Sequence, residues 1–245
     1  MPHSLFISDL HLCVKQPLGT QVFLRFMQHM APKAEALYIL GDLFESWAGD
    51  DELGDPFNQK ITHALRALAT GGTQVFIMHG NRDFLMAEKL AAACRATLLP
   101  DPALVVLYGM PTLLTHGDML CTDDTAYQAF RSQVHEPAWQ LQFLGQPLAQ
   151  RKALIEQLRA RSENEKQHKS NDLMGVNDTS VSNLLREHNY PRLIHGHTHR
   201  PMHILHHLDG NTCERWVLGD WHEAGYALQC SPDGCEHLTV TMPAC

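Results

Sequence analysis

Acidic, amide and imidazole side chains recur in five short motifs spread over the chain. These motifs are "DLH" with Asp9 and His11, "GD" with Asp42, "GNRD" with Asn81, "HGD" with His116, and "GHTH" with His197 and His199. One such motif alone is typical of a turn or a capping residue. Together they supply carboxylate and imidazole groups, which are the natural ligands of divalent transition metals. The set therefore indicates a metal centre.

Each motif directly follows a short apolar run that predicts a buried strand. The predicted strands are 4–8, 36–40, 73–78, 111–115, 192–195 and 215–219, with helical patterns at 20–30, 57–70, 84–95 and 176–189. Strand and helix alternation predicts an α/β layered fold. Ligands bind at the carboxyl ends of strands in such sheets, so we expect the motifs to converge there. Residues 225–230 and 237–242 predict a late antiparallel pair joined by a turn at 231–234.

Residues 124–172 contain no clear strand. The stretch 150–170 is amphipathic and carries six basic and three acidic residues, a local net charge of +3, whereas the whole chain has a net charge of −8. We predict that 124–172 form an inserted helical cap within a single domain spanning 1–245. The alternative interpretation is a helix pair that packs on the core and leaves its charges in solvent.

The composition of the 245 residues, with 44% hydrophobic residues, is typical of a soluble globular protein. The net charge of −8 argues against broad nucleic-acid binding, which usually requires a basic face. Seven cysteines, an odd number without a CxxC pair, indicate a reducing compartment. No apolar run approaches the roughly 18–20 residues of a membrane span, and the start lacks secretory signal features. We therefore expect a cytoplasmic protein.

The motif series DxH, GD, GNxD, HGD and GHxH resembles that of the calcineurin-like metallophosphoesterases. Longer stretches, among them "ALYILGDLFESWAGDD", "HGDMLCTDD" and "HGHTHRP", resemble the UDP-2,3-diacylglucosamine hydrolases (pyrophosphatases) of lipid A biosynthesis. The resemblance covers nearly the whole chain apart from the cap. It implies a four-layer αββα sandwich with two divalent ions, usually Mn²⁺. It also implies cleavage of UDP-2,3-diacylglucosamine to UMP and 2,3-diacylglucosamine 1-phosphate, through attack of metal-activated water on the α-phosphorus.

The resemblance also implies the roles of individual residues. One ion would take Asp9, His11, Asp42 and His199, and the other would take Asp42, Asn81, His116 and His197, with Asp42 as the bridge. Asn81, Arg82 and His197 would be catalytic and would contact substrate together with Asp124, Ser162, Lys166 and Lys169. Lys166 departs from the family pattern, which has Asn at that position. His79, His195 and Asp118 would support the ligands, and Trp139, Leu141, Phe143 and Leu144 would cover two acyl chains.

Arg82 stands where many metallophosphoesterases have a histidine that protonates the leaving group. A guanidinium cannot act as a general acid at neutral pH, but it binds phosphate oxygens in a bidentate manner. Arg82 therefore favours a diphosphate substrate, whose phosphate leaving group needs no proton. The alternative for Arg82 is a salt bridge to Asp83.

Two other functions remain open from the sequence: a metallophosphoesterase acting on another nucleotide or phosphodiester, and a metal-binding scaffold without catalysis. An amphiphilic substrate predicts peripheral contact with the cytoplasmic face of the inner membrane through the basic and apolar cap. We expect no nucleic-acid partner and no required protein partner. The sequence leaves a role for Asp220 and His222 near the ligands open.

Overall fold

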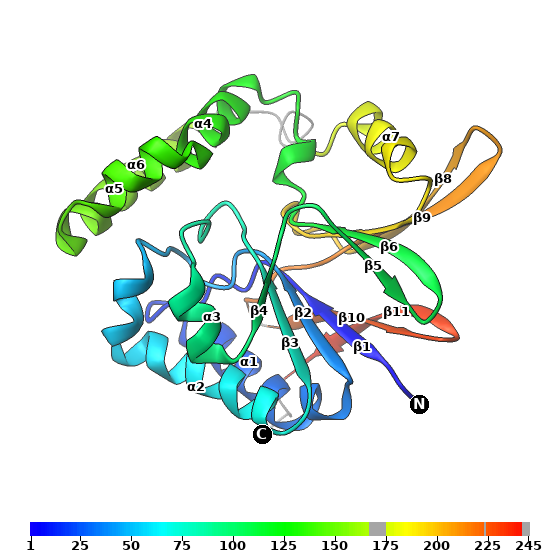
Figure 1. The fold of residues 1–245 in the computed structure, drawn as a ribbon, viewed down its shortest axis with the longest axis horizontal. Helices are drawn as coiled ribbons and strands as arrows, with labels where there is room; N and C mark the ends of the chain where they lie inside the picture. The colour runs from blue at the N-terminus through cyan, green and yellow to red at the C-terminus, as the bar shows by residue number, and fades with distance from the viewer. Residues whose placement is uncertain (167–174, 223, 242–245) are drawn as a thin grey trace.

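The computed structural model describes residues 1–166, 175–222 and 224–241, with the side chains of 161–166 left out. Two sheets dominate it (Figure 1). The first has the strand order β11-β10-β1-β2-β3-β4 and the second β5-β6-β7-β9-β8. The strands of the first sheet are β1 (Ser4–Ile7), β2 (Ala36–Leu40), β3 (Gln74–Met78), β4 (Thr97–Leu99), β10 (Gly225–Ser231) and β11 (Gly234–Val240). Those of the second are β5 (Ala103–Leu107), β6 (Met110–Thr115), β7 (Arg192–His195), β8 (Met202–Leu208) and β9 (Asn211–Val217).

The two sheets pack face to face and carry helices on their outer faces. The longer helices of these outer layers are α1 (Pro17–His29), α2 (Pro56–Thr70), α3 (Glu88–Cys94) and α7 (Asp178–Glu187), and short 3₁₀ turns span Ala31–Lys33, Asp50–Gly54 and Asp118–Leu120. Phe6 and Leu228 of the first sheet meet Ile194 of the second in the central apolar cluster. Helices α1 to α3 cover the first sheet, and α7 covers the second. The predicted four-layer αββα sandwich is confirmed.

Within each sheet, the strands that precede the five motifs run parallel to one another. β1 pairs with β2 and β2 with β3, and in the other sheet β6 pairs with β7. Every residue of β1, β2 and β7 is buried, as expected for parallel strands covered on both faces. Their carboxyl ends therefore deliver the five motifs to one end of the sandwich.

The predicted strands and helices are confirmed within a few residues of their expected ends, although β9 starts four residues early and α3 four residues late. Three strands were missed in the prediction: β4, β5 and β8. β4 has only three residues, and β8 contains three histidines that blur its alternation. β5 is an edge strand, and its apolar run "ALVVL" is of the kind that predicted the other strands, although Leu104 and Val106 are exposed in the structure.

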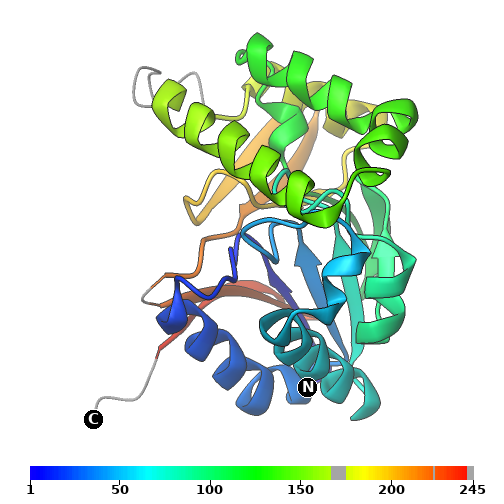
Figure 2. The same cartoon turned by 90° about the vertical axis from the view of Figure 1, so that its left-hand side faces the viewer.

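In its described residues, the cap consists of three helices, α4 (Thr125–His135), α5 (Pro137–Leu144) and α6 (Leu148–Lys166). Pro137, Gly145 and Pro147 mark the breaks between them, where proline cannot continue a helix. The helices lie across one end of the sandwich (Figure 2). Phe143 is buried in the core cluster of the first sheet, so one side of the cap packs on the core, as the alternative interpretation expected. Residues 167–172 of the predicted segment lie outside the described residues.

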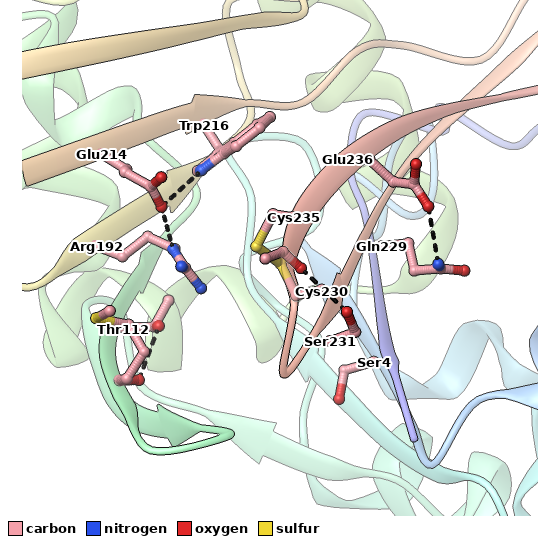
Figure 3. Close-up of a disulfide and its surroundings, with 12 residues drawn as sticks. Ser4, Thr112, Arg192, Glu214, Trp216, Gln229, Cys230, Ser231, Cys235 and Glu236 are labelled. Atoms are coloured by element: carbon pink, nitrogen blue, oxygen red, sulfur yellow. Dashed lines mark hydrogen bonds and ion pairs between the residues drawn. A yellow bond between two sulfur atoms is a disulfide. The ribbon is translucent and has the colours of Figure 1, made fainter. Parts of the chain in front are cut away.

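A disulfide joins Cys230 and Cys235 at the β10–β11 hairpin (Figure 3). The antiparallel register places the two cysteines directly opposite each other, with Cα atoms 4.1 Å apart. This bond differs from the expectation that the cysteine pattern raised, because a reducing compartment disfavours disulfides. The sequence spacing alone did not reveal that the two residues are cross-strand neighbours.

No helix in the described part of the chain combines the length and apolar character needed to cross a bilayer.

Candidate metal centre

Five of the proposed ligands have a left-handed backbone. They are Asp9, His11, Asp42, His197 and His199, with φ between 49° and 69°. This region is uncommon for residues with a side chain and costs of order 1–3 kcal/mol each. Such strain is maintained only where the surroundings over-determine it, typically at functional sites. The turns after β1, β2 and β7 therefore force these side chains into one space.

Asp9, His11 and His199 form the first cluster. Their ligand atoms all lie within 4.8 Å of one another. The Nε2 atoms of His11 and His199 are 3.3 Å apart, and His199 Nε2 lies 3.3 Å from Asp9 Oδ1. Three potential ligand atoms thus point toward a common centre.

Asp42 lies between this cluster and the second one. Its Oδ2 atom is 3.9 Å from His11 Nε2 and 3.8 Å from His116 Nε2. Asp9, Asp42 and His116 also bring their ligand atoms within 4.8 Å of one another. One carboxylate oxygen therefore faces an imidazole from each side, which is the placement that a bridging ligand requires.

Asn81 connects His116 to His197, the last of the predicted ligands. Its Oδ1 atom lies 3.1 Å from His116 Nε2 and 3.0 Å from His197 Nδ1. The backbone N–H of His197 donates to Asp9 Oδ2 at 2.9 Å. The structure thus brings all seven predicted ligands together, from strand ends in both sheets.

The charges of the cluster show that it suits a divalent cation. Burial alone would lower the pKa of His116, but Asp42 and Asp9 outweigh it and raise the pKa to about 9. The pKa of His199 rises to about 10 against the same effect of burial, through Asp220 and Asp9. The carboxylates therefore require positive charge beside them, which a metal ion supplies when it displaces these protons.

One buried ligand atom also lacks a hydrogen bond. Asp9 is fully buried, and its Oδ1 atom makes no hydrogen bond but lies 3.3 Å from His199 Nε2, another ligand candidate. A buried carboxylate oxygen without a hydrogen bond is costly unless it coordinates a metal. Together with the mixed carboxylate, amide and imidazole donors, this atom indicates that the residues fit a pair of divalent ions.

Carboxylates lie beside both histidines of the first cluster. Glu45 Oε2 lies 3.1 Å from His11 Nδ1, and Asp220 Oδ2 lies 3.2 Å from His199 Nδ1. The partner of His199 is of the kind that fixes the ring orientation and leaves Nε2 for a metal, whereas His11 Nδ1 makes no hydrogen bond and meets Glu45 as a nearby charge. The contact of Glu45 was missed from the sequence, although the residue stands in "GDLFE", three residues after the ligand candidate Asp42. Asp220 was left open, and His222 Nε2 lies 3.1 Å from its Oδ2 atom.

The predicted supporting residues have separate structural partners. His79 Nε2 lies 2.7 Å from the Met86 carbonyl oxygen, and His195 Nδ1 lies 2.9 Å from that of Gly196. Asp118 accepts hydrogen bonds from Tyr127 Oη at 2.6 Å and Arg131 Nε at 2.8 Å. Because Tyr127 and Arg131 belong to α4, Asp118 attaches the cap to the turn after β6.

Asp83 fixes two of the ligand-bearing turns to each other. Its fully buried carboxylate accepts from the backbone N–H groups of Gly80 at 2.9 Å, Asp42 at 3.3 Å and Phe44 at 3.2 Å. Burial, and then the charge of Asp42, raise its pKa to about 6. A glycine is required at position 80, because a Cβ there would lie 2.2 Å from Asp42 Oδ1.

Arg82 is held by its backbone and not by its side chain. Its N–H donates to Asp42 Oδ1 at 2.8 Å, and its carbonyl accepts from Trp47 N–H at 3.2 Å. Within the described part of the chain, the guanidinium makes no hydrogen bond or ion pair, so the alternative of a salt bridge to Asp83 is not observed. The side chain lines a cavity beside the ligands.

This cavity has a volume of about 640 Å³ and lies between the metal-ligand candidates and the cap. Asn81, Arg82, His197 and His199 line its polar end. The apolar lining consists of Trp47, Phe84, Leu85, Ala126, Phe130, Val134, Trp139, Phe143, Ile155 and Leu158. A polar end beside a long apolar wall matches a ligand that carries both phosphate and hydrocarbon.

The predicted cap residues differ in whether the structure places them at the cavity. Asp124 lines the cavity and also caps α4 by accepting from Tyr127 N–H at 3.1 Å. Trp139 and Phe143 line the cavity, whereas Leu141 is 78% exposed and Leu144 is 42% exposed, so the structure does not bring these two leucines to it. Ser162 and Lys166 lie on α6, but their side chains are not described, and Lys169 lies outside the described residues.

Known proteins similar to this chain agree with the geometry. The family model described as calcineurin-like phosphoesterase matches residues 3–201. A UDP-2,3-diacylglucosamine hydrolase of Aromatoleum aromaticum is 56% identical over 220 residues, which cover 90% of this chain and 89% of that protein. Proteins of the same name from Xanthomonas campestris pv. campestris strain B100 and Cellvibrio japonicus are 48% and 46% identical, over 94% and 95% of this chain and 96% of each relative. The resemblance in the motifs is thereby confirmed, and the chain belongs to the calcineurin-like phosphoesterases and, within them, to the family of the UDP-2,3-diacylglucosamine hydrolases.

Proposed function

We propose that this protein hydrolyses the pyrophosphate bond of UDP-2,3-diacylglucosamine in lipid A biosynthesis, releasing UMP and 2,3-diacylglucosamine 1-phosphate. The observation that carries this proposal is the cavity beside the cluster of metal-ligand candidates, in which Arg82 and three of these candidates meet an apolar wall: Asn81, His197 and His199. The names of relatives that are 46–56% identical over most of the chain support the choice of substrate.

Asp9, His11, Asp42 and His199 would hold one divalent ion, and Asp42, Asn81, His116 and His197 the other. We propose Mn²⁺ for both positions. Bound there, the ions would supply an activated water near neutral pH and neutralise charge on the phosphate oxygens. The protein's own contribution is to fix the ligands through strained turns and through the carboxylates of Glu45, Asp220 and Asp83.

Arg82, Asn81 and His197 would bind and orient the diphosphate. The guanidinium of Arg82 can bind two oxygens of the leaving sugar phosphate at once. Asn81 and His197 constrain each other, because Asn81 Oδ1 lies 3.0 Å from His197 Nδ1. Arg82 stands in place of a histidine that would donate a proton, which suits a leaving group that departs as a phosphate. In-line attack on the α-phosphorus then places the new oxygen in UMP.

The apolar part of the cavity would receive the acyl chains. Trp139 stacks on Phe143 with ring centroids 4.9 Å apart, and Phe84 of the core approaches Trp139 at 6.3 Å. These rings form a wall between α5 and the turn after β3. Substrate contacts by Asp124, Ser162, Lys166 and Lys169 remain part of this proposal.

Contact with the inner membrane is proposed to occur through the cap on the cytoplasmic side. Phe130 and Leu141 of the cap are exposed, at 39% and 78%, and can enter a lipid interface. Sedimentation with vesicles containing anionic lipid should carry the protein down, and a Phe130→Ser/Leu141→Ser variant should stay in the supernatant. Equal sedimentation of both proteins would contradict this contact.

Mass analysis of the products formed in oxygen-18 water tests the reaction. The purified protein loaded with Mn²⁺ should convert UDP-2,3-diacylglucosamine, and the label should appear in UMP. A label in 2,3-diacylglucosamine 1-phosphate would contradict attack on the α-phosphorus. A lack of hydrolysis under metal saturation would contradict the proposed function.

A further inference from the structure

Glu45 lies between a ligand candidate and the cap, and its two carboxylate oxygens have different partners. Oε2 lies 3.1 Å from His11 Nδ1, a buried atom that makes no hydrogen bond in the structure, so the contact between them is electrostatic. Oε1 forms an ion pair with the Nη2 atom of Arg159 on α6, and the Glu45 carbonyl accepts from Arg159 Nη1 at 3.2 Å. The side chain of Glu45 is 19% exposed, so this chain of contacts is largely shielded from solvent.

The backbone holds Glu45 at a fixed distance from His11. The segments after β1 and β2 continue side by side: His11 N–H donates to the Asp42 carbonyl at 3.0 Å, and Glu45 N–H donates to the Leu12 carbonyl at 3.2 Å. Leu12 and Phe44 form a parallel bridge. The backbone of Glu45 is therefore fixed beside His11, whereas the direction of its carboxylate depends on its two side-chain partners, His11 and Arg159.

We propose that Glu45 is a positioning residue that couples closure of the cap to the metal centre. One oxygen orients the His11 ring so that Nε2 faces the ion, and the other holds α6 over the cavity. The contact between cap and core thus includes a direct link to a metal ligand. This inference rests on the proposed function, because it assigns His11 to a metal.

Two other ion pairs attach α6 to the same loop but reach no ligand candidate. Arg151 pairs with Asp51 and also donates to the Ala48 carbonyl, and Lys152 Nζ lies 2.9 Å from Glu52 Oε2. Arg151 and Arg159 are eight residues apart and share a helix face. Lys152 supplies a matched control, because its removal breaks a contact between cap and loop without affecting Glu45.

Mn²⁺ titration of the metal-free protein, followed by calorimetry without substrate, tests the coupling. Glu45→Gln should lower the Mn²⁺ affinity of the site that contains His11 by about 10-fold or more. This is the usual loss when a partner of a metal-bound histidine is removed. Arg159→Met should weaken the same site by about 2- to 30-fold, the usual range for coupled residues. Lys152→Met should bind Mn²⁺ as the wild type does.

The double variant Glu45→Gln/Arg159→Met separates coupling from general loosening of the cap. Because Arg159 acts through Glu45, the double variant should match Glu45→Gln alone. Wild-type affinity in either single variant, or equal losses in Arg159→Met and Lys152→Met, would overturn the inference and leave the proposed function intact. Failure of the wild type itself to bind Mn²⁺ would instead contradict the proposed function.

Discussion

At the scale of single residues, the centre depends on side chains that their backbones hold in place. Asp9, Asp42 and His199 reach the centre from left-handed positions, where other fold elements must supply the stabilisation. Arg82 differs from them, because only its backbone is committed to the fold, through the N–H that donates to Asp42. Its guanidinium is therefore available to the substrate.

Replacement of Arg82 by alanine should lower turnover without removing metal. The backbone contact to Asp42 persists, whereas the bidentate contact to the leaving phosphate is lost, so we expect kcat to fall by about 100-fold or more. Arg82→Lys should retain part of the rate, since it keeps the charge but not the planar fork. Steady-state kinetics and metal analysis check both variants, and loss of bound Mn²⁺ in Arg82→Ala would assign Arg82 a structural role instead.

At the scale of elements, the site is made by turns that follow parallel strands. The turns after β2 and β3 converge because Asp83 accepts backbone N–H groups from both. The same turns approach so closely that a side chain at Gly80 would overlap Asp42. The strand order brings these two turns near each other, and local hydrogen bonds then fix their relative position.

Asp83→Ala should destabilise the metal-free protein strongly. Three buried N–H groups lose their acceptor, and each costs about 1–3 kcal/mol, so we expect a loss of at least about 3 kcal/mol in the free energy of unfolding. Asp55→Ala, which removes a single hydrogen bond to Phe57 N–H at the start of α2, should cost only about 1 kcal/mol. Urea unfolding measures both values, and equal losses would show that Asp83 does not join the turns.

Much of this arrangement was predictable because buried parallel strands and their terminal motifs leave a clear sequence pattern. The short strand β4 was missed because it has only three residues, and the edge strand β5 was missed although its apolar run matches the pattern of the buried strands. The link from Glu45 to His11 and Arg159 was also beyond prediction. His11 and Arg159 lie 34 and 114 positions away from Glu45 in the sequence but contact it in the fold. The spacing of residues along the chain does not reveal such contacts.

At the scale of the whole molecule, the sandwich and the cap contribute different parts of the candidate site. The sandwich supplies the proposed metal ligands, and the cap supplies most of the apolar cavity wall. Three of the six basic residues predicted for the cap, all on α6, attach it to the acidic loop after β2: Arg151, Lys152 and Arg159. The sequence revealed the excess of charge but not its partners.

Trp139→Ala should affect the lipid substrate selectively. Loss of an aromatic wall worth about 1.5–3 kcal/mol should raise KM for UDP-2,3-diacylglucosamine about 10-fold or more. Activity toward bis(p-nitrophenyl) phosphate, which has no acyl chain, should stay unchanged. Gln142→Ala on the same helix is the control, because Gln142 is exposed and does not line the cavity, so neither rate should change. A similar loss on both substrates would contradict acyl binding by the cap.

The most direct test of the central claim is anomalous diffraction from crystals grown with Mn²⁺. The account predicts two anomalous peaks on either side of the Asp42 carboxylate, one beside Asp9, His11 and His199 and the other beside Asn81, His116 and His197. A single peak, or no peak, in crystals grown with saturating Mn²⁺ would contradict the two-ion centre.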